Sequence, residues 1–208
     1  MHVRMLTTRT AQLTPTDNDA ANLQQALVDV IKNEITTADG RMTFARFMEL
    51  ALYAPNLGYY ANNLTKIGRN GDFITAPEIS PVFAQCLATQ CQQVLTTLDN
   101  GCIIEFGAGN GTLAINLLHA LADKHCLPKQ YYIVELSGHF RAQQQRSLKK
   151  QCPEHYDRVI WLDSLEGFSA KGIIIANEVV DAMPAHRFLI SHKQCQEYYI
   201  GFEENAFY

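Results

Sequence analysis

The sequence predicts an α/β fold built around a parallel sheet, and two observations support this prediction. Short apolar runs alternate with helix-like segments over the second half of the chain, as in folds with a parallel sheet. The first run leads into IIEFGAGNGT (residues 103–112), in which three glycines at alternate positions precede a helix-like segment. A strand, a glycine-rich turn and a helix in this order are typical of a nucleotide-type binding site.

The composition is that of an ordinary globular protein. The chain has 208 residues, 47% of them hydrophobic and 18% charged, which is enough for one sizeable core. Its net charge of −4 provides no basic surface for nucleic acid. No apolar run approaches the length of a membrane span. The six cysteines form no C-x-x-C pair and the seven histidines no H-E-x-x-H motif, so we expect reduced thiols and no metal site.

The chain divides into three expected regions. Residues 1–19 are expected to form a flexible N-terminus. Residues 20–98 should contain a helix over about 20–36, a second helix capped by Thr43, and a long ordered loop over 55–79 that includes GDFITAPEIS. A further helix should begin at Ser80-Pro81 and lead into the first strand. Residues 99–208 would then form the ligand-binding domain.

The glycine spacing indicates which ligand is expected. A dinucleotide-binding turn, G-x-G-x-x-G, would need glycine at position 112, where this chain has Thr112. The pattern here is E-x-G-x-G-x-G, and it resembles the first motif of class I S-adenosylmethionine-dependent methyltransferases. A nicotinamide-dependent oxidoreductase is disfavoured by Thr112, and a glycine-rich turn without a ligand is the plain structural alternative. The motif residues are Glu105, Gly107, Gly109 and Gly111.

Polar side chains end the next three predicted strands. Glu135 closes the strand over 131–137, where a carboxylate can accept hydrogen bonds from both ribose hydroxyls. Asp163 closes the next strand and either contacts the adenine amino group or serves as a turn residue. Because the carboxyl ends of parallel strands share one edge of the sheet, these side chains should gather there. The fourth run, over 171–184, ends in Asn177, Glu178 and Asp181.

Four blocks in order give the sequence a more specific resemblance. They are GDFITAPEIS (71–80), IIEFGAGNGTL (103–113), YIVELS (132–137) and IIIANEVVDAMPAHRF (173–188). Together they resemble the MidA family of S-adenosylmethionine-dependent methyltransferases over roughly residues 25–202. The resemblance implies a Rossmann-like class I methyltransferase sheet with helices on both faces, preceded by an N-terminal helical segment. Family members generally run longer, so the sheet is expected to be incomplete at the C-terminus and the cofactor domain truncated.

The resemblance also implies a function, namely methylation of a protein arginine, linked to assembly of a respiratory complex. S-adenosyl-L-methionine is the implied cofactor, and the implied compartment is the bacterial cytoplasm or, alternatively, the mitochondrial matrix. The glycines would line the cofactor and Glu135 would hold its ribose. Asp72, Thr75, Pro77 and Glu78 would form the wall near the methionine end and the substrate mouth, and Asn177, Glu178 and Asp181 would lie beside the transferring methyl.

Arginine chemistry gives an independent reason to consider these acids. The guanidinium group is a poor nucleophile because it stays protonated, so a site for it should contain carboxylates that orient the planar group. Glu178 and Asp181, with Glu78, are the candidates. The alternative for each acid is a charge that complements a helix N-terminus. A non-catalytic assembly or binding protein that retains the fold is the alternative for the chain as a whole.

Overall fold

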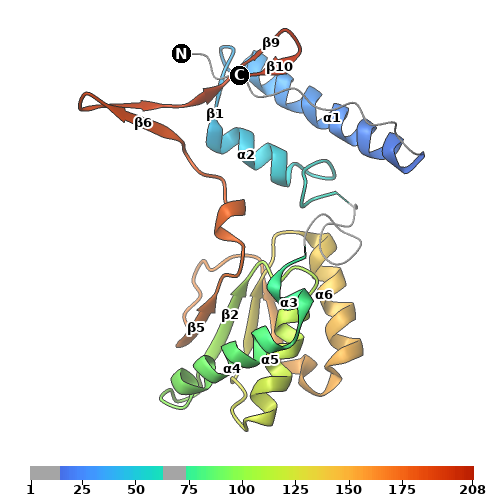
Figure 1. The fold of residues 1–208 in the computed structure, drawn as a ribbon, viewed down its shortest axis with the longest axis vertical. Helices are drawn as coiled ribbons and strands as arrows, with labels where there is room; N and C mark the ends of the chain where they lie inside the picture. Colours follow the sequence, from blue (N-terminus) through green and yellow to red (C-terminus); the bar gives the residue numbers. More distant parts are fainter. Residues whose placement is uncertain (1–14, 63–73) are drawn as a thin grey trace. The chain divides into compact units, whose positions relative to one another are not determined.

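A computed structural model describes residues 15–62 and 74–208, with side chains described from residue 20 onward. The chain forms two compact units, and each is described here by itself (Figure 1). One unit joins the segment that ends at Asn62 to Ala182–Tyr208, and the other spans Asn63–Asp181.

The second unit contains a parallel sheet, as the sequence predicts. Its four strands are β2 (Cys102–Phe106), β3 (Tyr131–Val134), β4 (Val159–Leu162) and β5 (Gly172–Ile175), in the order β4-β3-β2-β5. Every neighbouring pair in this sheet is parallel. The helices are α3 (Ala76–Ile79), α4 (Val82–Leu95), α5 (Thr112–Asp123), α6 (Gly138–Gln151) and the 3-10 helix η1 (Pro153–Arg158). The predicted α/β class is therefore confirmed.

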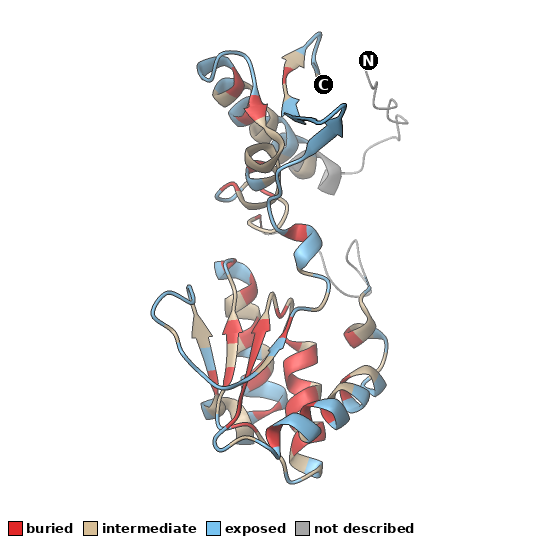
Figure 2. Ribbon diagram, turned by 90° about the vertical axis from the view of Figure 1, so that its left-hand side faces the viewer, coloured by how far each residue is buried: buried red, intermediate tan, exposed pale blue. Residues whose placement is uncertain are grey.

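The core of this unit lies between one face of the sheet and the three long helices. Ile103, Tyr131 and Ile133 point to this face from adjacent strands and are fully buried. They pack in one cluster with apolar residues of α4, α5 and α6, such as Ala88 and Leu117. Figure 2 shows this layer as a continuous buried band. Burial of these side chains provides the main driving force that holds the glycine-rich turn in place at the strand ends.

The opposite face of the sheet is covered differently. Two successive right-handed crossovers, β2-α5-β3 and β3-α6-β4, run in one direction and so place both helices on the same face. The return from β4 to β5 passes through residues 163–171, where Phe168 packs edge-on against Tyr132 with ring centroids 4.8 Å apart. Ile160 and Ile174 on this face are 38% and 65% exposed. Among the described residues of this unit, this face is thus less tightly covered than the face on which α5 and α6 pack.

The first unit pairs segments from both ends of the sequence. It contains α1 (Pro15–Thr37), β1 (Met42–Thr43), α2 (Phe44–Tyr53), the hairpin of β6 (Phe188–Ser191) and β7 (Gln194–Glu197), β8 (Tyr199–Ile200), β9 (Phe202–Glu203) and β10 (Ala206–Phe207). Strand β1 pairs with β8, so that Met42 lies opposite Ile200. Thr43 caps α2 as predicted, because its hydroxyl accepts a hydrogen bond from the Arg46 N–H. No helix in the described ranges is long and apolar enough to cross a lipid bilayer.

Three details differ from the sequence-based expectations. Helix α1 begins at Pro15 rather than near residue 20, since proline suits the first turn of a helix. Of the loop expected over 55–79, residues 63–73 lie outside the described part of the chain, and the remainder contains the short helix α3, with Pro77 in its first turn. The two units also divide the chain differently from the boundary expected near residue 98. Helix α4 lies before that point and packs in the core of the sheet, whereas the residues after Ala182 pair with the N-terminal segment.

Gly172 provides a test of the sheet. A Cβ added there would overlap the backbone of Cys102 on the neighbouring strand. We expect Gly172→Ala to lower the free energy of unfolding by about 1–3 kcal/mol, the usual cost of overpacking, measured by urea unfolding. Gly138→Ala is the matched control, because a Cβ at Gly138 meets nothing within 4 Å. Equal stability of the two variants would contradict the β2–β5 pairing.

Candidate functional site

The turn between β2 and α5 is built by its three glycines. Gly107, Gly109 and Gly111 have φ angles of +59°, +55° and +90°, in the left-handed region that side chains with a Cβ rarely adopt. The Gly107 N–H donates to the Val134 carbonyl at 3.0 Å, which joins the turn to the end of β3. The glycines stand at alternate positions because every second residue of this turn has left-handed backbone.

Thr112, which breaks the dinucleotide pattern, has a structural role at the start of α5. The Asn110 side-chain oxygen accepts hydrogen bonds from both the Thr112 N–H at 3.0 Å and the Thr112 hydroxyl at 2.8 Å. These bonds satisfy one of the free N–H groups at the helix start. A glycine at position 112 could not supply the hydroxyl, so Thr112 helps to fix the end of the turn.

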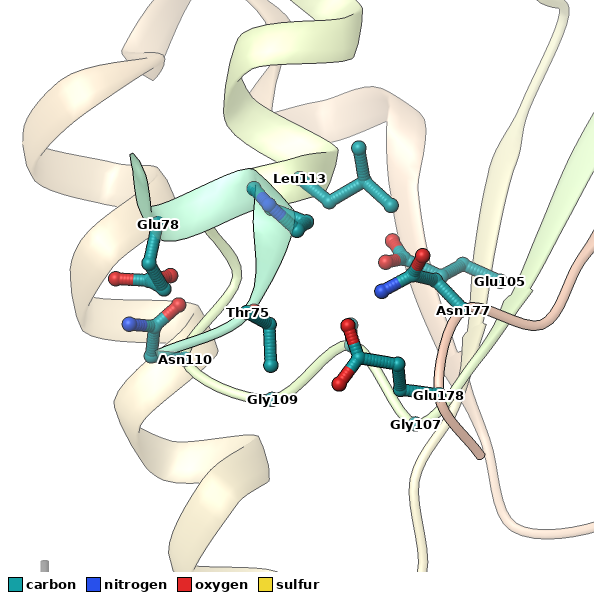
Figure 3. Close-up of a pocket in the computed structure, with 11 residues that line it drawn as sticks. Thr75, Glu78, Glu105, Gly107, Gly109, Asn110, Leu113, Asn177 and Glu178 are labelled. Atoms are coloured by element: carbon teal, nitrogen blue, oxygen red, sulfur yellow. The ribbon is translucent and has the colours of Figure 1, made fainter. Parts of the chain in front are cut away.

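A pocket of about 420 Å³, including its open mouth, lies above the turn (Figure 3). In Figure 3 the Glu178 carboxylate points into the pocket, on the same side as Glu105 and Asn177, while Glu78 and Asn110 lie on the opposite side. The pocket brings together eight residues that the sequence singled out: Thr75, Pro77, Glu78, Glu105, Gly107, Gly109, Asn177 and Glu178.

Glu178 has an unusual backbone conformation. Its φ angle is +51°, although it is not a glycine. Left-handed backbone in a non-glycine residue has a conformational cost and occurs most often where a site requires a side chain to point in a set direction. The strain at Glu178 therefore indicates that the loop after β5 is shaped to place this carboxylate.

Glu105 is the most deeply buried acid of the pocket. It is 2% exposed, and its Oε2 accepts a hydrogen bond from the Tyr131 hydroxyl at 2.6 Å. Burial raises the pKa of Glu105 to about 7, and the nearby Glu135 charge adds to this, whereas the bond from Tyr131 acts in the opposite direction. A carboxyl group with this pKa can take up or release a proton near neutral pH as a cation enters or leaves the pocket.

Glu135 is fixed by two hydrogen bonds at the end of β3. Its Oε1 accepts from the Ser137 N–H at 2.9 Å, and its Oε2 accepts from the Gln144 side-chain amide, also at 2.9 Å. Burial raises the pKa of Glu135, and the bonds from Ser137 and Gln144 oppose this rise. Each oxygen keeps a lone pair for a further donor. Glu135 does not line the pocket, but Gln144 connects it to the glycine turn through a bond to the Gly109 carbonyl at 2.8 Å.

The remaining predicted residues lie elsewhere. Asp163 forms an ion pair with Arg141 at 2.8 Å, and its side chain is 90% exposed. Gly111 faces α6, where an added Cβ would touch Gln144 at 3.5 Å. Asp181 is exposed in the 3-10 helix η2 (Val180–Ala182). Asp72 lies outside the described residues.

Three residues that shape this site were not predicted from the sequence: Tyr131, Asn110 and Gln144. Gln144 carried a usable signal, because Phe140, Gln144 and Leu148 recur at intervals of four and all three are buried on α6. A glutamine within an apolar stripe indicates a buried polar contact. Tyr131 and Asn110 had no comparable signal, since their roles depend on the register of β2 with β3 and on the conformation of the turn.

One group of side chains outside the pocket has metal-ligand chemistry. His119 Nε2 lies 3.2 Å from Glu154 Oε1, and the Cys152 sulfur is close to both. Burial raises the pKa of Cys152 to about 11, and exposed acidic groups such as Glu154 are common without a bound metal ion. Glu154 is exposed to solvent, and its pKa is lowered by a backbone hydrogen bond. We therefore assign no metal ion to this group of side chains.

Comparisons with known proteins agree with this geometry. Residues 86–207 match the model of a family of S-adenosyl-L-methionine-dependent methyltransferases. The chain is 30% identical over 177 residues to the mitochondrial protein arginine methyltransferase NDUFAF7 of Danio rerio, a match that covers 73% of this chain and 41% of that protein. It is 26% identical over 209 residues to the mitochondrial NDUFAF7 homolog of Caenorhabditis elegans, covering 89% of this chain and 47% of that protein.

A solved structure matches nearly the whole chain. A COG1565 superfamily protein from Burkholderia thailandensis, crystallised with S-adenosylhomocysteine, superposes with a TM-score of 0.84 at 39% identity. The match covers 96% of this chain and 52% of that one, so the chain spans about half the length of the relatives it matches. With the glycine turn, the acid-lined pocket and the family match in agreement, the chain belongs to the family of S-adenosyl-L-methionine-dependent methyltransferases.

Proposed function

We propose that this chain binds S-adenosylmethionine above the glycine turn and serves the transfer of its methyl group to an arginine of a protein substrate. The observation that carries the proposal is the lining of the pocket, where the acids Glu78, Glu105 and Glu178 surround bare backbone at the strand ends. Such a site accepts cations, and both the methyl donor and a guanidinium group are cations. Relatives named as protein arginine methyltransferases support the choice of substrate.

The residues present fit the methyl donor. When bound, S-adenosylmethionine supplies an electrophilic methyl group on a positively charged sulfur. The glycines leave room for it to lie against the backbone, and the Glu105 carboxylate faces the end of the pocket where its ammonium group would lie. The two free lone pairs of Glu135 suit the paired ribose hydroxyls. Asp163 would contact the adenine end of the methyl donor.

The acceptor side is assigned to the loop after β5 and to α3. Glu178 and Asn177 would orient the guanidinium plane through paired hydrogen bonds, with positive charge favoured on the nitrogen that does not attack. Thr75, Pro77 and Glu78 would form the opposite wall. Alignment of the nucleophile, the methyl carbon and the sulfur then supplies much of the rate acceleration. Asp181 and Asp72 would be further acids on the side of the pocket that binds the substrate.

The biological substrate follows from the family resemblance. We expect an arginine on a subunit of a respiratory complex, in the mitochondrial matrix or the cytoplasm of a bacterium. The named relatives are mitochondrial, and the solved relative comes from a bacterium.

Two measurements on the full chain test the proposal. Calorimetric titration with S-adenosylhomocysteine should show one saturable site, while NAD should show none. Radiolabelled methyl transfer from S-adenosylmethionine should then label an arginine-containing protein, but not the same protein with that arginine replaced by lysine. Binding of the cofactor without transfer to any arginine would favour the alternative, a non-catalytic protein that retains the fold. Tight binding of NAD instead of S-adenosylhomocysteine would overturn the cofactor assignment.

A variant of Glu135 tests the ribose contact. Glu135→Gln replaces one oxygen by an amide, so one hydroxyl acceptor and the negative charge are lost. Loss of charge-assisted hydrogen bonds should weaken binding of S-adenosylhomocysteine by about 10- to 100-fold, as measured by calorimetry. Glu166→Gln, an exposed acid after β4, is the control and should bind like the unmodified chain. An unchanged affinity in Glu135→Gln would remove this residue from the site.

A further inference from the structure

Gln144 on α6 is a buried polar residue, and two of its three hydrogen bonds lead toward the site. Its side chain is completely buried. The amide nitrogen donates to the Gly109 carbonyl at 2.8 Å and to Glu135 Oε2 at 2.9 Å, and the amide oxygen accepts from the Trp161 ring N–H at 2.9 Å. Both donors and the acceptor are therefore satisfied, as a buried amide requires.

These bonds connect three segments that the chain topology leaves separate. Gly109 belongs to the turn after β2, Glu135 to the end of β3, and Trp161 to β4. At Gly111, an added Cβ would lie 3.5 Å from the Gln144 Cα, so the turn packs directly against this part of α6. One amide thus fixes both the shape of the turn and the rotation of the carboxylate.

We propose that Gln144 is a positioning residue that presets the glycine turn and the Glu135 carboxylate for the methyl donor. This inference rests on the proposed function. Without Gln144, Glu135 keeps backbone donors from its own loop and the nearby Arg141 charge but loses its side-chain donor, and the Gly109 carbonyl loses its side-chain donor as well. Ligand binding would then have to order both groups, and that ordering lowers affinity.

Gln144→Glu is the discriminating variant, because it keeps the shape and the acceptor for Trp161 but loses both donors. It also places a second carboxylate against Glu135. The other charged or titratable groups around this pair are Arg141 on the same helix and Glu105 on β2. Two adjacent carboxylates share one proton readily, and the protonated acid can donate again. Relative to the unmodified chain at the same pH, affinity for S-adenosylhomocysteine should therefore be at least about tenfold lower at pH 8, and the difference should shrink as the pH is lowered toward 5.

The matched control is Gln145→Glu, which makes the same charge change one residue further along α6. It should bind the ligand like the unmodified chain at both pH values. A purely structural role for Gln144 would instead lower the thermal midpoint and leave the affinity of the folded protein without a pH-dependent recovery. Equal affinity of Gln144→Glu and Gln145→Glu, or a loss of affinity that does not change with pH, would overturn the inference.

A second measurement needs no ligand. In Gln144→Leu, amide hydrogen exchange in the segment 107–112 should become faster, while exchange in α4 stays unchanged. Unchanged exchange in the turn would overturn the positioning role even if the unmodified chain binds S-adenosylhomocysteine. If the unmodified chain fails to bind that ligand, the proposed function itself fails, and this inference fails with it. The two failures are therefore distinguishable.

Discussion

Replacing Glu178 by glutamine is expected to lower the rate of methyl transfer by at least about 100-fold while leaving the affinity for S-adenosylhomocysteine nearly unchanged. The carboxylate would hold the guanidinium group through charge-assisted hydrogen bonds, and its loss should cost about as much as removing one preorganised group from a transition state. The rate is measured by radiolabelled transfer at saturating donor, and the affinity by calorimetry. A drop in rate with constant affinity separates the acceptor role from the donor role.

Glu204 offers a closely matched control for this variant. It is also an exposed glutamate with left-handed backbone, at φ +48° against +51° for Glu178. Glu204→Gln should transfer methyl groups at the normal rate. If Glu178→Gln does the same, Glu178 has no part in the mechanism, and its strained backbone needs another explanation.

Replacing Glu105 by glutamine is expected to change stability and ligand binding in opposite directions. Because burial raises the pKa of Glu105 from 4.5 to about 7, the folded state holds a proton that the unfolded chain releases in this window. The contribution of Glu105 to the free energy of unfolding is fully present below pH 4.5 and is lost as the pH rises toward 7. At pH 8 the neutral glutamine should therefore make the chain more stable than the unmodified one, by about 3 kcal/mol from linkage.

The same substitution should weaken binding. At pH 8 the unmodified chain presents a carboxylate to the ammonium group of the donor, and glutamine does not. We expect urea unfolding from pH 4.5 to 8 to show a smaller decline in stability for Glu105→Gln, together with affinity for S-adenosylhomocysteine at least about tenfold lower at pH 8. If stability rises and affinity does not fall, Glu105 is a structural partner of Tyr131 only.

The parallel sheet could be predicted because its signals are local. Each strand is a short apolar run, and each is followed by a polar residue or a glycine turn. The pairing of β1 with β8 could not be predicted, because two-residue strands are too short to show a periodic pattern. In addition, the paired residues Met42 and Ile200 lie far apart in the sequence. The division of the chain into two units depends on that pairing. The boundary expected near residue 98 was instead based on the position of the glycine motif.

Several residues that line the pocket were singled out from the sequence and their roles stay predictions, whereas the contacts that connect them were not predicted. Glycine spacing and strand-end acids identify Gly107, Gly109, Glu105 and Glu178 from the sequence, because chemistry limits which residues serve at such positions. The supporting contacts depend on three-dimensional register. Tyr131 reaches Glu105 only because β2 and β3 pair with Ile103 opposite Tyr131.

The two walls of the pocket come from separate excursions of the chain, since β5 lies on the other side of β2 from β3 and β4. The donor wall follows β2, whereas Asn177 and Glu178 follow β5 and share no turn with it. The walls meet at Gly107, where an added Cβ would overlap the Val179 side chain, and substitutions away from this contact need not disturb the other wall. A lineage with this architecture can exchange one acceptor for another while keeping its cofactor, and its range of products can broaden without a new fold.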